Sequence, residues 1–89
     1  MNIEPNKFYK CKNYYLLVYP SKEKVATSTC TAVERVEYCS KELNCEITYS
    51  EKDSVFLVLE TGLNYIKILS KDTLGWISYR EWLNLVAVT

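Results

Sequence analysis

Four cysteines are the side chains of this 89-residue chain best suited to chemistry: Cys11, Cys30, Cys39 and Cys45. Zinc sites usually take such thiolates in close pairs, often with histidine, but the sequence has no Cys-x-x-Cys pair and no histidine. In a reducing compartment, cysteines of this kind act as small apolar residues. We expect Cys39 and Cys45 in the core and Cys30 in a loop, where it is the thiol to test for reactivity. A four-thiolate zinc site and disulfides in an oxidising setting remain the alternatives.

Catalysis by familiar groups is not expected. Without histidine, the commonest general base is missing. The carboxylates are scattered along the chain rather than clustered, at Glu34, Glu37, Glu42, Glu46, Glu51, Asp53 and Glu60. The sequence contains no phosphate-binding or metal-binding loop motif. We therefore predict a protein that is not an enzyme and carries no cofactor or metal.

Aromatic residues are the remaining candidates for function, since the chain has eight tyrosines and two tryptophans. Tyrosine and tryptophan are enriched at protein interfaces. One small core cannot satisfy every tyrosine hydroxyl, so some must lie on the surface. We predict that Trp76 lies in the core and that another protein is bound through a patch formed by Tyr15, Tyr19, Tyr65, Tyr79 and Trp82.

The charge balance lowers the case for nucleic acid as a partner. Eleven basic and eleven acidic residues give a formal net charge of zero, whereas nucleic-acid-binding domains usually carry a basic surface. The alternative to protein binding is single-strand nucleic-acid binding, in which tyrosines stack on bases beside a basic groove. Its lysines would be Lys7, Lys10, Lys12 and Lys67.

The expected location is the cytoplasm. The first residues, MNIEPNKFYK, lack the basic start and apolar run of a signal peptide. The most apolar stretch, YYLLVY, is far too short to span a bilayer. We therefore predict no membrane association.

Hydrophobic patterning predicts a single domain, residues 1–89, built mostly of strands. The run at 14–19 is apolar throughout, which favours a central strand buried on both faces. Gly62 is expected to supply a positive φ in the turn at 61–64. The last strand could pair with a second copy, so a monomer or weak homodimer is expected. The predicted strands are 7–12, 14–19, 45–49, 55–59, 65–69, 74–78 and 83–88, with a tight helical turn at 79–82.

Residues 21–43 form a predicted helical insertion. Ser21 could cap a helical turn reaching Val25 or Thr27. Thr31 and Glu34 match a capping box for a second helix that ends at Leu43, whose apolar stripe is Ala32, Val36, Cys39 and Leu43. The alternative is one helix across the whole segment.

The segment NYIKILSKDTLGWISYREWL resembles the C-terminal half of bacterial Src-homology-3-like (SH3-like) domains. Lys67 and Ile68 match the alternating strand, the run 75–77 matches the Gly-Trp-Val step, and 79–83 match the helical turn and closure. Tyr65 stands where the family often has tryptophan. The chain departs from the pattern in lacking a glycine at 71–73, in its helical insertion and in having no export signal. Gly75 is expected to let the strand bend sharply or to let Trp76 approach closely.

The resemblance implies an α+β, mostly β fold: a small SH3-like antiparallel barrel of five to seven short strands with a helical insertion at about 21–43. The expected function is that of a non-catalytic protein-binding module. The chain also looks like small accessory proteins of tailed bacteriophages, which implies a viral regulator or inhibitor of a host protein.

Overall fold

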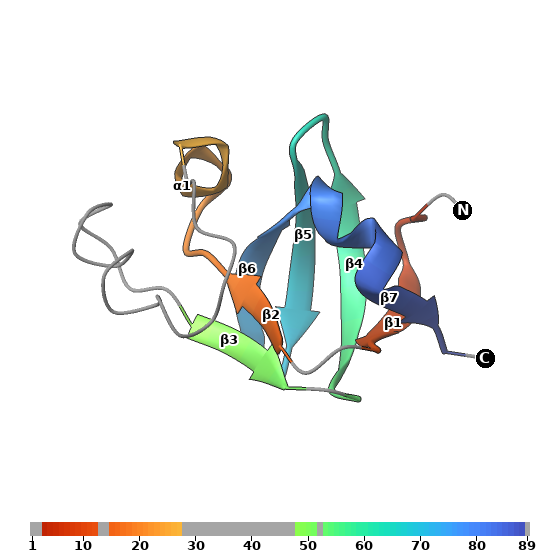
Figure 1. Ribbon diagram of the computed structural model, residues 1–89. Helices are drawn as coiled ribbons and strands as arrows, with labels where there is room; N and C mark the ends of the chain where they lie inside the picture. Colours follow the sequence, from red (N-terminus) through yellow and green to blue (C-terminus); the bar gives the residue numbers. More distant parts are fainter. Residues whose placement is uncertain (1–2, 13–14, 28–47, 52, 89) are drawn as a thin grey trace.

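The computed structural model describes residues 3–12, 15–27, 48–51 and 53–88 (Figure 1). Strands dominate these residues, so the mostly β class is confirmed. In chain order the elements are β1 (Lys7–Cys11), β2 (Tyr15–Val18), α1 (Lys22–Thr27), β3 (Thr48–Glu51), β4 (Val55–Thr61), β5 (Tyr65–Ser70), β6 (Thr73–Ser78), the 3₁₀ helix η2 (Tyr79–Asn84) and β7 (Leu85–Ala87).

Five antiparallel strands form the main sheet, in the order β6-β5-β4-β1-β7, while β2 and β3 pair separately. The two sheets meet where the Tyr19 N–H donates to the Trp76 carbonyl at 2.7 Å and the Trp76 N–H donates to the Tyr19 carbonyl at 2.9 Å. Figure 1 shows the β2–β3 ribbon lying across β6. Among the described residues the main sheet is open, so closure into a barrel remains a prediction.

The central strand of the main sheet is β4, as the apolar run at 55–59 predicts. The prediction of a central strand at 14–19 is wrong, because β2 forms its ladder with β3 alone and the chain is hydrogen-bonded to β6 by a single bridge at Tyr19, just after β2. Alternating side chains of the main sheet point to one core, in which Cys11 is fully enclosed. The core residues are Ile3, Tyr9, Cys11, Leu16, Phe56, Val58, Ile66, Ile68, Ile77 and Leu85, with Val18, Tyr79 and Trp82 packed against them.

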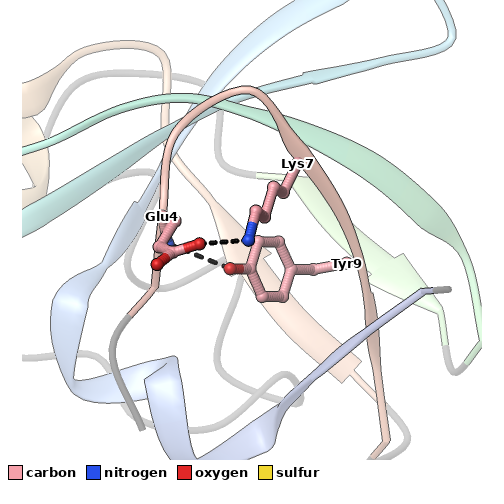
Figure 2. A network of polar contacts seen from close by, with 3 residues as sticks. All are labelled: Glu4, Lys7 and Tyr9. Carbon is pink, nitrogen blue, oxygen red and sulfur yellow. Dashed lines mark hydrogen bonds and ion pairs between the residues drawn. The ribbon is translucent and has the colours of Figure 1, made fainter.

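The segment before β1 is held against the sheet by a small polar network (Figure 2). The Glu4 N–H donates to the buried Tyr9 hydroxyl at 2.9 Å, and the Glu4 carboxylate pairs with the Lys7 ammonium. The hydrogen bond between the Lys7 ammonium and the Glu4 carboxylate, together with the negative charge of that carboxylate, raises the pKa of Lys7. The network gives the Tyr9 hydroxyl a partner and keeps Ile3 in the core.

The two hairpin turns of the main sheet differ in whether their residues take positive φ and in the role of glycine. Lys71 and Asp72 take φ values of 49° and 65°, as a two-residue turn between the paired Ser70 and Thr73 requires. The prediction that Gly62 has positive φ is wrong. Its missing side chain instead makes room for the Tyr65 ring, since an added Cβ would lie 2.7 Å from Tyr65 Cζ.

Gly75 is buried and allows a close approach, but the prediction that Trp76 approaches it is wrong, because the approaching group is Val18 of β2. An added Cβ at Gly75 would collide with Val18 Cγ1. Trp76 was expected in the core, and this is wrong. It is partly exposed on the opposite face of the sheet, with the Lys67 ammonium 5.5 Å from its ring centroid.

The first part of the helical insertion is confirmed. The Lys24 N–H donates to Ser21 Oγ at 3.3 Å, so Ser21 caps α1, which ends at Thr27 as predicted. The helix expected at 31–43 and the cysteines Cys30, Cys39 and Cys45 lie outside the described residues, as does the choice between one helix and two. Neither described helix has the length and apolar character needed to cross a membrane.

Candidate functional site

A groove of about 500 Å³ lies where α1, the β4–β5 turn and η2 meet. This volume is in the range of ligand pockets, about 300–1,000 Å³. Its lining combines aromatic, apolar and polar side chains with one cation. The lining residues are Val25, Leu63, Asn64, Ser78, Tyr79, Arg80 and Trp82.

Ser78 and the 3₁₀ geometry of η2 place the two aromatic residues of the groove. Ser78 keeps an extended backbone, and its Oγ accepts from the Arg80 N–H at 3.3 Å and from Arg80 Nε at 3.4 Å. With about three residues per turn, side chains three apart lie on the same side of a 3₁₀ helix. Tyr79 and Trp82 therefore project together, and each also packs against the core.

The β4–β5 turn and α1 supply the rest of the lining. The Tyr79 N–H donates to the Asn64 carbonyl at 3.1 Å, which ties the turn to the start of η2. Leu63, next to Asn64, is 95% exposed. Val25 of α1 is buried and gives the groove an apolar surface. Leu63 therefore adds exposed apolar surface to the lining of the groove.

Tyr65 lies beside this region without lining the groove. Its hydroxyl donates to Glu60 Oε2 at 2.6 Å, and the Lys22 ammonium of α1 lies 5.7 Å from its ring centroid. The hydrogen bond to Glu60 raises the pKa of Tyr65, with smaller contributions from desolvation and from the negative charges of Glu60 and Glu23. The Tyr65 ring is therefore fixed in place rather than presented to a ligand.

A β-bulge makes the Tyr65–Glu60 contact possible. The register between β4 and β5 shifts from Val58↔Ile68 to Glu60↔Lys67, so Leu59 is the extra residue. Strict alternation from the buried Val58 would have turned Glu60 toward the core. The bulge places it opposite Lys67, on the outward face.

The structure brings together two of the five predicted binding residues, Tyr79 and Trp82. Tyr65 is their neighbour, on the outward face of the sheet. Tyr19 is 4% exposed and belongs to the interior, so it is not available to a partner. Tyr15 lies in β2, and its side chain is outside what the structure describes.

Sequence reasoning did not single out Leu63 and Arg80. An available signal was the apolar Leu63 within a turn, a place where polar residues dominate. The position of Arg80 two residues after a capping serine was a second signal. Val25 could not have been assigned, because its place in the groove depends on how α1 packs against β5 and β6.

Three of the four lysines named for nucleic-acid binding lie next to a carboxylate. Lys7 pairs with Glu4, Lys10 Nζ lies 3.7 Å from Asp53 Oδ1, and Lys67 is opposite Glu60 in the sheet. This arrangement weakens the argument for a positive groove. Within the described ranges, no group of three metal-ligating side chains is close enough to hold an ion.

No protein-family model, curated protein or solved structure matches the chain.

Proposed function

We propose that this chain is a non-catalytic protein-binding module that holds a segment of another protein in the groove between α1, the β4–β5 turn and η2. The observation that carries the proposal is the convergence of Tyr79, Trp82 and Arg80 on a cavity of about 500 Å³ with the exposed Leu63 among its lining residues. Tyrosine, tryptophan and arginine are the residue types that dominate binding energy at protein interfaces.

The chemistry of the lining defines the segment that would fit. Aromatic faces and Val25 favour an apolar or aromatic side chain, because burying such a group against them removes apolar surface from water. Arg80 adds a cation whose planar guanidinium suits a carboxylate. Its Nε already donates to Ser78, which orients the group. The preferred ligand is therefore a peptide segment that carries an apolar side chain next to an acidic one.

The wider biological role follows from resemblance. The predicted SH3-like barrel with a helical insertion, and the sequence likeness to phage accessory proteins, are the grounds for proposing a small regulator or inhibitor that occupies the surface of a host protein. Single-strand nucleic-acid binding is not carried forward, since three of the four lysines named for it lie beside carboxylates.

Photo-crosslinking tests the proposal. With p-benzoylphenylalanine in place of Leu63, irradiation should join the chain to a second, different protein from a cell extract. Arg80→Glu in the same chain should reduce the adduct by at least roughly tenfold, since loss of an arginine hot spot costs about 2 kcal/mol or more.

The matched control carries the crosslinker at Leu74, an exposed leucine of β6 that does not line the groove. The heterologous adduct should be absent from that control. Equal heterologous adducts from both positions, or an adduct at Leu63 that Arg80→Glu leaves intact, would show that the groove is not the binding site.

A further inference from the structure

A row of apolar side chains crosses all five strands of the main sheet on the face away from the core. The register pairs Leu74 with Leu69, Leu69 with Leu57, and Leu57 with Phe8. The Val88 N–H donates to the Phe8 carbonyl at 3.0 Å, which extends the row beyond β7. Paired residues of antiparallel strands point to the same side of a sheet. The row therefore forms one continuous strip.

A second pair of apolar residues widens this strip. Lys10 is paired with Val55 on one side and with Val86 on the other, so both valines share the outward face with Phe8. The exposed fractions of the five most exposed members run from 37% for Val86 to 52% for Phe8. We call this surface the outer apolar face: Phe8, Val55, Leu57, Leu69, Leu74, Val86 and Val88.

The area of this face matches what a dimer needs. The five most exposed members, each 37–52% exposed, together present apolar surface on the order of 400 Å², within the range of the largest apolar patches on monomers, which are often functional. A stable protein interface buries about 800 Å² per partner, of which a little over half is apolar. The outer apolar face could thus form the apolar part of one standard interface, with a polar rim around it.

We propose that the outer apolar face binds the same face of a second copy of this chain. Its charges suit a copy of itself. On one side of the row Lys10 lies 3.7 Å from Asp53, and on the other Lys67 is opposite Glu60. Each side carries both signs, and the chain has zero net charge, so two copies do not repel one another.

This face has no excess of one charge, so it does not favour a strongly charged partner. Two-fold symmetry lets the same patch serve both copies. Stacking two sheets through their outward faces buries the row on both sides, as in a β-sandwich. This surface is separate from the groove, so the homodimer leaves the groove free for another protein.

Sedimentation velocity of the full chain over a wide concentration series tests the homodimer. The sedimentation coefficient of the wild-type chain should rise with concentration from that of a monomer to that of a dimer. Leu74→Glu should raise the dissociation constant at least roughly tenfold, because it buries a charge in the interface. Circular dichroism checks that the variant is folded, and Phe8→Glu is the second variant if it is not.

Leu63→Glu is the matched control, since Leu63 is a more exposed leucine that lies off this face. It should dimerise like the wild-type chain. A wild-type chain that stays monomeric at every concentration would overturn the proposal. Undiminished dimerisation of folded Leu74→Glu would also overturn it, because the dimer would then form through another surface.

Discussion

Replacing Gly75 by alanine tests how β2 is packed against β6. The added methyl would occupy space that Val18 Cγ1 holds. Val18 is part of β2, whose next residue, Tyr19, is hydrogen-bonded to Trp76. The Val18 backbone therefore cannot retreat without shifting the β2–β3 pair, and its β-branched side chain has few alternative χ1 rotamers.

Two effects of opposite sign compete in this variant. Alanine in a strand gains roughly 0.5–1 kcal/mol over glycine, because the unfolded chain loses less freedom on folding. Forcing a methyl group into a packed core costs about 1–3 kcal/mol. If the contact with Val18 is as close as the geometry indicates, the packing cost wins, and Gly75→Ala lowers the free energy of unfolding by about 1–2 kcal/mol.

A double-mutant cycle with Val18→Ala isolates the contact. Val18→Ala alone should cost about 1 kcal/mol for the lost methyl groups. In the double variant the collision is absent, so alanine at position 75 should gain its roughly 0.5–1 kcal/mol over glycine, which gives a favourable coupling of about 1–3 kcal/mol. Urea unfolding followed by tryptophan fluorescence measures all four chains, with Trp76 and Trp82 as the probes.

Two results would refute this reasoning. One is a Gly75→Ala chain as stable as the wild type or more stable, which would mean that backbone entropy dominates and Val18 moves freely. The other is additive behaviour of the two substitutions, which would mean that the residues do not touch. A destabilisation of 1 kcal/mol corresponds to a fall in Tm of about 4–8 °C for a domain of this size.

Two further predictions concern Tyr65 and Lys71. The hydrogen bond to Glu60 raises the Tyr65 pKa above its ordinary 10.0. The stability that this hydrogen bond contributes is therefore complete below pH 10.0, the ordinary pKa that applies to the unfolded chain. It is lost as the pH rises through the higher pKa of the folded state. Glu60→Gln should bring the Tyr65 pKa back toward 10.0 in a ¹³C NMR titration, and an unchanged value would contradict the assigned contact. Lys71→Gly should raise the free energy of unfolding by about 0.5–1 kcal/mol, because glycine takes positive φ without steric cost. Leu63→Gly, at a turn residue without positive φ, should instead lower it by a similar amount in the same urea titration.

Local pattern predicted most of the main sheet. The hairpin of β5 and β6 follows from alternating apolar residues on either side of a polar turn, and its residues pair as the spacing requires. Ser21 at the start of α1 and the tight turn after Ser78 follow from capping chemistry. These features depend on residues close in sequence, so they could be derived from sequence alone.

Features that join distant segments could not be derived in this way. The groove needs α1 packed beside the β4–β5 turn and η2, and nothing in residues 22–27 specifies that position. The same holds for Val18 against Gly75, where the sequence pattern predicted a close approach but assigned it to Trp76. Tyr19 was assigned to the surface because its pairing with β6 has no local signal.

The position of Trp76, by contrast, was predicted incorrectly although the sequence contained the answer. Size alone favours a tryptophan in the core. A two-residue turn at 71–72 fixes the hairpin register, however, and that register pairs Trp76 with Lys67. An unpaired lysine in a core is costly, so Lys67 must face outward and Trp76 with it. The outward tryptophan then has the Lys67 ammonium over its ring, while Ile66, Ile68 and Ile77 fill the core. In a hairpin with a short turn, one charged residue thus decides the face of every residue in both strands.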